Sequence, residues 1–585
     1  MSSFKGYGKV DELEEQAFRL KTRKRLLIVT VSVIVLLAVI IGAVTGTVIH
    51  NRNSSSSPSP NTEPATQLTP SASLKAVCGV TQYPNSCFSS ISSLKNSNTT
   101  DPEALFKLSL HVAINEASKL KDLPTAIKSK IGNDTKLESA IKVCETVFDD
   151  AVDKLNDSLS AMDVSSGEKL LSEAKINDLK TWISATMTDQ ETCLDSLEDI
   201  NSTYVQVFRD AMQNSTEYAS NSLAIVAKIL GLLSNLNIPV HRRLLGYGGE
   251  TSSVPEFPGW VSPGDRRLLQ QQNLTAHVIV AKDGTGDFKT IQEAVNAVPT
   301  KNLSRFVIYV KQGTYEENVN MDKSKWNVMM YGDGKTKTIV SGNLNYVDGT
   351  ATFNTATFAV AGRGFIAKDI GFINTAGAAK HQAVAFRSGS DQSVFCRCSF
   401  DAFQDTLYAH SNRQFYRDCD ITGTIDFIFG NAAVVFQNCN IKPRQPMPNQ
   451  FNTITAQGKK DPNQNTGISI QKCTISPLES NMTALTFLGR PWKNFSTTVF
   501  LQSSIGSFLN PSGWTEWISN VDPPNTIFYA EYQNSGPGSS VDKRVTWAGY
   551  RPSLTDTEAA KFTVESFIQG NEWLPQTNVN FETSL

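Results

Sequence analysis

The sequence predicts a multidomain protein in which an N-terminal all-α four-helix bundle precedes a right-handed parallel β-helix. Between residues 74 and 240, apolar residues recur at three- and four-residue steps, the pattern of amphipathic helices. Beyond residue 275, short β-rich runs take over and repeat one another. Between these two parts, residues 241–274 are rich in Pro, Gly and polar side chains, which is typical of a linker.

The composition is that of an ordinary globular protein with several domains. The chain has 585 residues, of which 40% are hydrophobic, and a formal net charge of -2. A chain of this length is expected to form about two to four domains. The near-zero charge does not suit a nucleic-acid binder, so no nucleic acid is expected as a partner. An acidic polymer would have to be held by local contacts rather than by long-range attraction.

The N-terminal 73 residues are predicted to direct the chain to a membrane and into the secretory pathway. Residues 26–49 form an uncharged run of roughly 24 residues, long enough to cross about 30 Å of hydrocarbon as a helix. Basic residues cluster just before this run, so residues 1–25 should remain in the cytosol. We expect residues 26–49 to be a signal anchor in type II orientation; a cleaved signal peptide would lead to the same compartment. Residues 50–73, rich in Ser, Pro and Thr, are predicted to be a flexible linker.

Cysteines and glycosylation sequons agree with this compartment. All nine cysteines follow the apolar run. Sequons of the form N-x-S/T recur at Asn98, Asn133, Asn156, Asn201, Asn214, Asn273, Asn302, Asn481 and Asn494. A glycoprotein with disulfide bonds is therefore expected.

The bundle, residues 74–240, is predicted from four amphipathic stretches. They cover residues 105–120, 137–162, 168–198 and 202–235. Helices of this length favour antiparallel packing. Of the four cysteines here, Cys78 and Cys87 flank a short turn, whereas Cys144 and Cys193 lie in two long helices. Disulfides Cys78–Cys87 and Cys144–Cys193 are favoured, although the spacing permits other pairings. No catalytic cluster occurs here, so a bundle that binds a partner is expected.

The linker, residues 241–274, contains the tetrapeptide Arg-Arg-Leu-Leu twice. The dibasic pairs are Arg242–Arg243 and Arg266–Arg267. An extended, exposed dibasic pair suits the cleft of a protease. Two copies between two domains predict processing by a protease.

The β-helix, residues 275–585, is predicted from runs that align with one another. Equivalent positions recur roughly 20 to 34 residues apart, a spacing typical of stacked units. They are Ile370, Cys398, Cys419, Cys439, Cys473 and Ser504. Strand units without crossover helices indicate a parallel β-helix, whereas an immunoglobulin-like sandwich would need hairpin turns. One short helix is expected at residues 290–297.

Two aspartates in apolar surroundings mark the candidate active site, within residues 399–430. Asp405 and Asp426 lie seven residues after Cys398 and Cys419, so they occupy equivalent places in adjacent coils. Such positions are about 4.8 Å apart, so both side chains can face one cleft. Because burying a carboxylate costs several kcal/mol unless it is paired or protonated, a pair of them indicates function.

Two neighbouring carboxylates are compatible with three kinds of chemistry. They could hydrolyse a glycosidic bond, bind calcium for a lyase, or hydrolyse an ester with Asp as the nucleophile. Calcium would need further oxygen ligands, and no acidic cluster beyond the pair supplies them. A serine esterase is disfavoured because the G-x-S-x-G motif is missing. The histidines after residue 275 (His277, His381 and His410) lack zinc-ligand spacing. We expect no metal and no cofactor.

Several segments resemble plant pectin methylesterases. QDTLY at residues 404–408 and DFIFG at residues 426–430 match two signatures of this family. GTGDFKTIQEAV, TFNTATF, HQAVAFR and LGRPW match further segments in the same order. The resemblance implies a β-helix enzyme that hydrolyses methyl esters of homogalacturonan in plant cell walls, giving de-esterified pectin and methanol. Residues 74–240 resemble pectin methylesterase inhibitor domains, which implies an autoinhibitory pro-domain and, as possible partners, separate inhibitor proteins.

The resemblance also assigns roles to individual residues. It makes Asp426 the nucleophile that attacks the C6 carbonyl, oriented by Arg490 of LGRPW. It makes Asp405 the proton donor for departing methanol and then the base for water. Transition-state stabilisation falls to Gln404, and the oxyanion hole to Gln382. Substrate binding is implied for Thr352, Gln382, Phe429, Arg490 and Trp492.

The resemblance further favours one disulfide in the β-helix. Cys398, Cys419 and Cys439 occupy successive coils, so a single bridge can use only two of them. The family pattern supports Cys419–Cys439, with Cys396, Cys398 and Cys473 as small core residues.

Two rival functions remain. The β-helix could be an inactive pectin-binding module, with the bundle inhibiting other esterases; the intact set of site residues argues against this. A hydrolase of the pectin backbone would produce new reducing ends instead of methanol.

Overall fold

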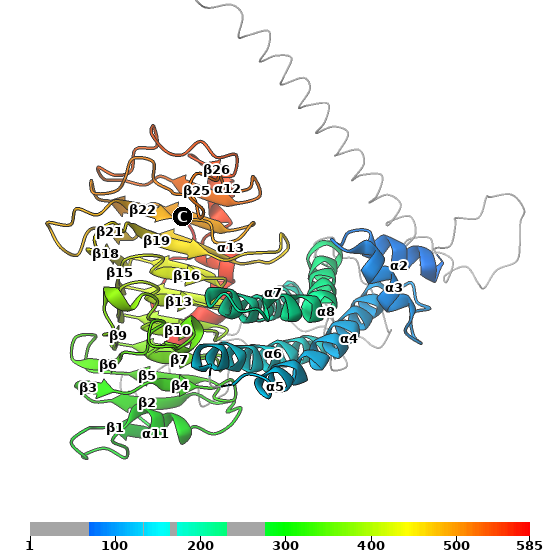
Figure 1. Ribbon diagram of the computed structural model, residues 1–585, viewed down its shortest axis with the longest axis horizontal. Coiled ribbons are helices and arrows are strands. Elements are labelled where there is room, and N and C mark those ends of the chain that lie inside the picture. Colours follow the sequence, from blue (N-terminus) through cyan, green and yellow to red (C-terminus); the bar gives the residue numbers. More distant parts are fainter. Residues whose placement is uncertain (1–68, 133, 164–171, 231–274) are drawn as a thin grey trace, which may run out of the picture.

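The computed structural model describes residues 69–132, 134–163, 172–230 and 275–585. A helical bundle lies beside a long stack of β-coils (Figure 1). The predicted cytosolic tail, the signal anchor at residues 26–49, most of the linker at 50–73, and the processing linker with Arg242–Arg243 and Arg266–Arg267 lie outside the described residues. Among the described helices, none combines the length and the apolar character that a membrane span requires.

The bundle contains the four long helices that the sequence predicts, with three short ones. They are α2 (Pro70–Cys78), α3 (Pro84–Ser92), α4 (Pro102–Leu120), α5 (Asp122–Lys128), α6 (Thr135–Ala161), α7 (Glu173–Asp199) and α8 (Val205–Ile225), which a short π-helix, η1 (Val226–Leu230), continues. Side-chain caps fix four of the starts: Thr69, Asp101, Asp134 and Ser172 accept hydrogen bonds from the first turns of α2, α4, α6 and α7. Helix α2 begins at Pro70, inside the stretch predicted to be linker.

Both predicted disulfides of the bundle are confirmed. Cys78–Cys87 ties α2 to α3, and Cys144–Cys193 ties α6 to α7. All four sulfurs are buried among the apolar side chains of the bundle.

The second part is a parallel β-helix of three sheets, in which every paired strand is parallel. The 11-stranded sheet contains β1 (Val278–Val280), β2 (Phe306–Val310), β5 (Val328–Tyr331), β8 (Ile366–Lys368), β11 (Ser393–Cys396), β14 (Arg413–Arg417), β17 (Ala433–Gln437), β20 (Gly467–Gln471), β23 (Thr497–Leu501), β25 (Phe528–Tyr532) and β26 (Tyr550–Arg551). The 8-stranded sheet contains β3 (Gly313–Glu316), β6 (Thr338–Gly342), β9 (Gly371–Asn374), β12 (Ser399–Asp401), β15 (Asp420–Gly423), β18 (Asn440–Pro443), β21 (Thr474–Ile475) and β24 (Ser504–Ile505).

The 7-stranded sheet is the one that positions the candidate site. It contains β4 (Val319–Met321), β7 (Phe358–Val360), β10 (Phe386–Ser388), β13 (Leu407–Ala409), β16 (Ile428–Gly430), β19 (Asn452–Gln457) and β22 (Thr486–Gly489). Apolar side chains from all three sheets fill the interior, where aromatic rings of successive coils stack.

Short helices close the ends of the β-helix and cover one outer face. The predicted helix at 290–297 is α11 (Ile291–Asn296), which begins with a capping box formed by Thr290 and Glu293. Near the C-terminus, α12 (Asp556–Ala560), α13 (Val564–Ile568), α14 (Gly570–Trp573) and the 3₁₀ turn η4 (Leu574–Thr577) follow one another. Apolar residues of α13, α14 and η4 pack on the 11-stranded sheet. Two other 3₁₀ turns are η2 (Thr352–Asn354) and η3 (Ala378–Lys380).

The register confirms the predicted repeat, with one correction. Ser399 pairs with Asp420, Asp420 with Asn440, and Asn440 with Thr474, so the preceding cysteines stack in one column. Because Thr474 pairs with Ser504, the next member of this column is Ser503. The sequence alignment placed Ser504 there and is wrong by one residue.

The predicted disulfide Cys419–Cys439 is wrong: Cys396, Cys398, Cys419, Cys439 and Cys473 are all free and buried. Equivalent side chains of stacked parallel strands leave the backbone in the same direction rather than toward each other. A suitable Cα separation is therefore not sufficient for a bridge. The thiols instead donate to main-chain carbonyls: Cys419 Sγ lies 3.4 Å from Phe395 O, and Cys439 Sγ lies 3.6 Å from Tyr416 O.

Candidate active site

Asp405 and Asp426 occupy equivalent positions in adjacent coils, as the repeat predicts. Asp405 precedes β13 and Asp426 precedes β16, whose residues Leu407 and Ile428 pair. Both aspartates have a left-handed backbone, with φ of 64° and 50°. This conformation is uncommon outside glycine, although Asp tolerates it better than most residues. Both side chains line one cavity of about 170 Å³, with only 8% and 5% of each residue exposed.

Asp426 is held as an acceptor of several hydrogen bonds. Arg490 donates from Nε to Oδ1 at 2.9 Å and from Nη2 to Oδ2 at 2.6 Å. Thr453 Oγ1 donates to Oδ1 at 2.6 Å and accepts from the Asp426 main-chain N–H at 2.8 Å. A bidentate guanidinium binds the ionised carboxylate and fixes its plane. Burial opposes the charge of Arg490, but Asp426 outweighs this effect and raises the pKa of the guanidinium.

Asp405 is in a different electrostatic environment. Its carboxyl has no hydrogen-bond partner among the residues that the structure describes. Burial raises the pKa of Asp405 well above its usual range, and the negative charges of Asp426 and Asp199 raise it further. Arg490 acts in the opposite sense but does not reverse the shift. Asp405 is therefore suited to carry a proton, whereas the carboxyl group of Asp426 is fixed in place by Arg490.

The other predicted site residues line the same cavity: Thr352, Gln382, Gln404, Phe429, Arg490 and Trp492. Gln382 and Gln404 come from successive coils, since the N–H of Ala383 donates to the carbonyl of Gln404 at 3.2 Å. Within the described ranges, neither side-chain amide is engaged in a hydrogen bond. Both amides can therefore donate to a substrate oxygen in the cavity.

Aromatic rings form one wall of the cavity. Tyr408 stacks on Phe429 with centroids 4.2 Å apart, and the Trp492 ring lies 6.4 Å from that of Phe429. Trp517 stacks on Trp492 at 6.2 Å and lies 4.3 Å from the Arg490 guanidinium. Tyr408 and Trp517 are site residues that the sequence does not predict. The two segments carry the available signal: QDTLY includes Tyr408, and the aromatic-rich segment 510–517 ends at Trp517.

Helix α7 of the bundle forms the opposite wall. Its residues Thr192, Asp195, Ser196 and Asp199 line the cavity with the site residues. Thr352 Oγ1 donates to Asp199 Oδ2 at 3.3 Å. Burial raises the pKa of Asp199 to about 6. The sequence predicts a partner-binding bundle but not these residues, although acidic side chains recur every four residues along this face of α7.

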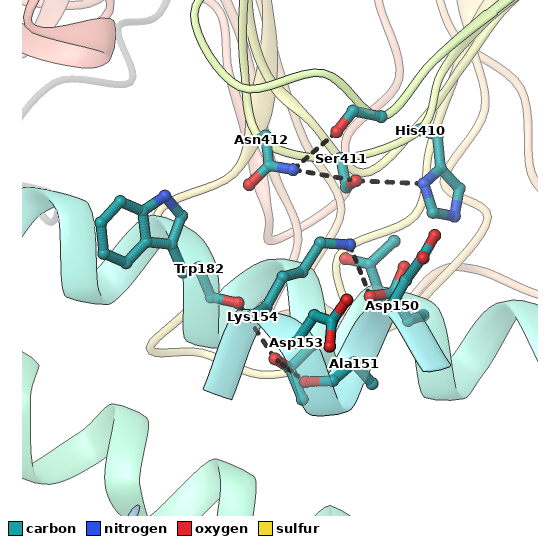
Figure 2. A network of polar contacts seen from close by, with 12 residues as sticks. Asp150, Ala151, Asp153, Lys154, Trp182, His410, Ser411 and Asn412 are labelled. Atoms are coloured by element: carbon teal, nitrogen blue, oxygen red, sulfur yellow. Dashed lines mark hydrogen bonds and ion pairs between the residues drawn. The ribbon is translucent and has the colours of Figure 1, made fainter. Parts of the chain in front are cut away.

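Further contacts join the bundle to the β-helix beside the cavity. Thr192 Oγ1 lies 2.9 Å from His410 Nε2, and the other ring nitrogen of His410 lies 3.1 Å from Ser411 Oγ. Burial lowers the pKa of His410 well below its usual value, so the ring is neutral. Figure 2 shows Lys154 of the bundle between Trp182 and His410.

Ion pairs reinforce this interface at several points. Arg413 Nη2 donates to Asp178 of α7 at 2.7 Å and to Asp391 of its own domain at the same distance. Lys323 pairs with Asp149 and Asp153 of α6. In the part of the chain that the structure describes, no group of three or more His, Cys, Asp or Glu residues could hold a metal ion.

Comparisons with known proteins match each of the two parts of the chain to a known family. A family model described as Pectinesterase matches residues 277–571, and one described as Plant invertase/pectin methylesterase inhibitor matches residues 72–225. Pectinesterase 3 of Phaseolus vulgaris is 64% identical over 592 aligned positions, covering 100% of both chains. Pectinesterase 1 of Arabidopsis thaliana is 60% identical and covers 99% of both. The solved pectin methylesterase from carrot is 51% identical, with a TM-score of 0.52, and corresponds to 54% of this chain and 100% of its own. The chain belongs to the pectinesterase family and is a carboxylic ester hydrolase with an N-terminal inhibitor-type domain.

Proposed function

We propose that the β-helix hydrolyses the methyl esters of homogalacturonan in plant cell walls through an acyl-enzyme on Asp426. The arrangement that supports this most is the contrast between the two aspartates in one cavity. Asp426 is bound by Arg490 through two hydrogen bonds, and Asp405 is buried with a strongly raised pKa. One group is thus prepared to attack and the other to donate a proton.

The proposed reaction has two steps. Asp426 attacks the C6 carbonyl, and the amides of Gln382 and Gln404 donate to the oxyanion. Asp405 gives its proton to the methoxy oxygen, methanol leaves, and a mixed anhydride with Asp426 remains. Asp405, now a carboxylate, removes a proton from water, whose oxygen attacks the acyl carbon. Galacturonate then departs, and Asp426 and protonated Asp405 are restored.

The walls of the cavity suit a polymer of sugars. Phe429 and Trp492 present aromatic faces on which the apolar faces of galacturonate rings can stack. Thr352 lies on the side where α7 now covers the cavity and would bind substrate once α7 leaves.

We also propose that the bundle keeps the enzyme inactive until the linker is cut. Four α7 residues occupy the wall of the catalytic cavity, and Asp199 uses the hydroxyl of Thr352. Cleavage by a protease at Arg242–Arg243 or Arg266–Arg267 would allow the bundle to leave. Separate inhibitor proteins with the same helical fold would bind the freed surface.

The cell wall is the proposed destination of the enzyme. The apolar run at residues 26–49 would carry the chain into the secretory pathway and anchor the precursor in type II orientation. A membrane protein extracted only by detergent would support the anchor, and a soluble precursor that begins after residue 49 would contradict it.

Methanol release from highly methylated pectin tests the chemistry. Residues 270–585 are suitable because the β-helix has its own core and the whole solved chain of the carrot enzyme corresponds to only 54% of this protein. We expect Asp426→Asn to lower the rate at least about a thousandfold, since the nucleophile is lost. The exposed Asp283→Asn is the matched control.

Three outcomes would contradict the proposal. A folded parent that releases no methanol would favour the inactive pectin-binding module. Equal release by the parent and Asp426→Asn would move the chemistry to another residue. New reducing ends without methanol would indicate a hydrolase of the pectin backbone.

A further inference from the structure

We propose that Lys460 and Lys493 form a binding site for the carboxylate of a de-esterified galacturonate unit, beside the catalytic cavity. This inference rests on the proposed function and extends it: the enzyme would recognise acidic homogalacturonan as well as its methyl ester.

The two lysines already share a carboxylate in the structure. Lys493 Nζ donates to Glu191 Oε1 at 2.8 Å, and Lys460 Nζ donates to Glu191 Oε2 at 2.5 Å. Lys493 also pairs with Asp195. Only 15% of the Lys493 side chain is exposed. Burial would raise the pKa of Glu191, but the two lysines hold it below its usual value. The pair therefore binds an ionised carboxylate.

These carboxylates all come from α7. Within the described residues, neither Lys460 nor Lys493 forms an ion pair with an acidic residue of its own domain. When the bundle leaves, two ammonium groups lose their partners at the edge of the substrate-binding face. The Glu191 carboxylate is the same chemical group as the C6 carboxylate of galacturonate, and its position marks where that group would bind.

The lysines lie next to the catalytic cavity. A second cavity of about 240 Å³, lined by Lys460 and Glu191, shares Asp195, Tyr408 and Trp492 with the catalytic one. Lys493 Nζ is 5.2 Å from the centre of the Trp492 ring. A galacturonate unit has an apolar ring face and a carboxylate, so a single unit can stack on Trp492 and pair with Lys493.

The position of the two lysines beside the catalytic cavity would affect the order in which the esters of one chain are hydrolysed. Each turnover converts a neutral ester into a carboxylate, and the lysines bind only the product form. A chain that carries newly formed carboxylates would be retained beside Asp426, so that neighbouring esters are hydrolysed in succession. Acidic residues recur one helical turn apart in α7, at 191, 195 and 199, and would imitate such a chain.

Competition by polygalacturonate tests the site. In residues 270–585, we expect Lys460→Gln/Lys493→Gln to raise the inhibition constant of polygalacturonate oligomers about tenfold or more, because charge-assisted hydrogen bonds are lost. Lys460→Arg/Lys493→Arg should restore most of the affinity. The control Lys289→Gln/Lys561→Gln removes two exposed positive charges elsewhere and should change nothing. Block lengths of the de-esterified product should shorten in the Gln variant only.

Direct binding of polygalacturonate, followed by calorimetry, separates this inference from the proposed function. If the parent binds the oligomers, the Gln variant does not, and the parent releases no methanol, the esterase proposal fails and the lysine site stands. If the parent is active and the Gln variant binds as tightly as the parent, the lysines serve only the bundle and the inference fails.

Salt dependence covers the case in which the Gln variant does not fold. The affinity of the parent should fall between about 50 mM and about 500 mM salt, because ion pairs at a partly exposed site are screened. An unchanged affinity, or an Arg variant that binds poorly, would overturn the site.

Discussion

Arg490 donates two hydrogen bonds to Asp426, whereas Asp405 lies in the same cavity with its pKa raised by burial and by neighbouring negative charge. The difference between the two aspartates is thus a property of their partners rather than of their backbone, since both have the same left-handed conformation. The assignment of nucleophile and proton donor depends on these partners.

Replacement of Arg490 by Lys tests the role of the bidentate contact. Lys keeps the charge but cannot donate two parallel hydrogen bonds to one carboxylate. We expect kcat for methanol release to fall about 10- to 100-fold, with a smaller change in KM, because the proposed nucleophile, Asp426, would lose its orientation. The exposed Arg551→Lys is the control. A kcat equal to that of the parent would show that positive charge alone is sufficient.

Replacement of Asp405 by Asn should raise stability while it removes activity. The folded pKa of Asp405 is raised, so the protonated form is favoured on folding. That contribution is complete below the pKa of the unfolded chain and is lost as pH rises through the folded pKa. Asn is neutral at every pH and avoids this loss. In residues 270–585, whose Asp405 still faces Asp426, thermal unfolding should show a higher midpoint for the variant at neutral pH and similar midpoints near pH 3. A gap that widens as pH falls would contradict the prediction.

At the residue level, the repeat of the coils predicted that the two aspartates lie together, whereas the other candidate site residues followed from the family resemblance. Asp405 and Asp426 follow Cys398 and Cys419 at the same interval, and the register keeps this equivalence. Trp517 and the α7 residues could not be found in this way. Trp517 reaches the cavity from outside the aligned coils, and α7 reaches it from another domain.

At the level of elements, α7 closes the cavity with carboxyl groups whose pKa depends on docking. Burial raises the pKa of Asp195 to about 7 and that of Asp199 to about 6. The neighbouring Lys493 acts in the opposite sense on both, and Glu191 adds to the rise at Asp195. A pKa raised by docking means that the docked state binds more protons than the separated domains.

The affinity of the bundle for the β-helix should therefore increase as the pH falls from about 7 to below about 6, the range in which Asp195 and Asp199 take up protons. After cleavage within residues 241–274, we expect the bundle to remain bound at about pH 5 and to dissociate more readily at about pH 8, as followed by size-exclusion chromatography. Asp195→Asn/Asp199→Asn should flatten this dependence, since neither amide titrates. Docking that tightens as pH rises would contradict the assignment.

The column of cysteines predicts a simple chemical result. The unreduced chain should present five reactive thiols in denaturant and almost none when folded, since the five free cysteines are buried. Titration with a thiol reagent measures both numbers. Three thiols in denaturant would restore the Cys419–Cys439 bridge that the structure excludes.

Periodicity explains which elements were predictable. The long helices and the β-coils have strong repeating patterns, so their existence and type followed from the sequence. Ser504 was misplaced by one residue because the last runs are short and resemble the earlier ones only weakly, so comparing them does not fix the register of the last coils. The cysteine pairing failed because Cα spacing does not specify the direction of the side chains.

At the level of the whole molecule, the two domains share an apolar cluster as well as ion pairs. Phe148 and Phe208 of the bundle belong to the same buried cluster as Phe353, Tyr408 and Phe429 of the β-helix. Lys323, Arg413 and Lys493 pair with acidic residues of α6 and α7. Both the burial of apolar surface and the ion pairs thus hold the bundle against the β-helix.

This arrangement could not be predicted from the sequence. The contacts join residues that are more than a hundred positions apart, such as Thr192 with His410, and no periodic pattern encodes such pairs. The resemblance to inhibitor domains implied that the bundle acts on the enzyme, but not that α7 lines the catalytic cavity.

The most direct test of this account is methanol release from methylated pectin, recorded while a protease cuts the full chain within residues 241–274. If α7 covers the site that contains Asp405 and Asp426, the uncut chain should be nearly inactive. The rate should rise at least about tenfold as the bundle separates, since departure of α7 would open the cavity to substrate. The same experiment with Asp426→Asn should give no methanol before or after cleavage. An uncut chain as active as the separated β-helix would contradict the account.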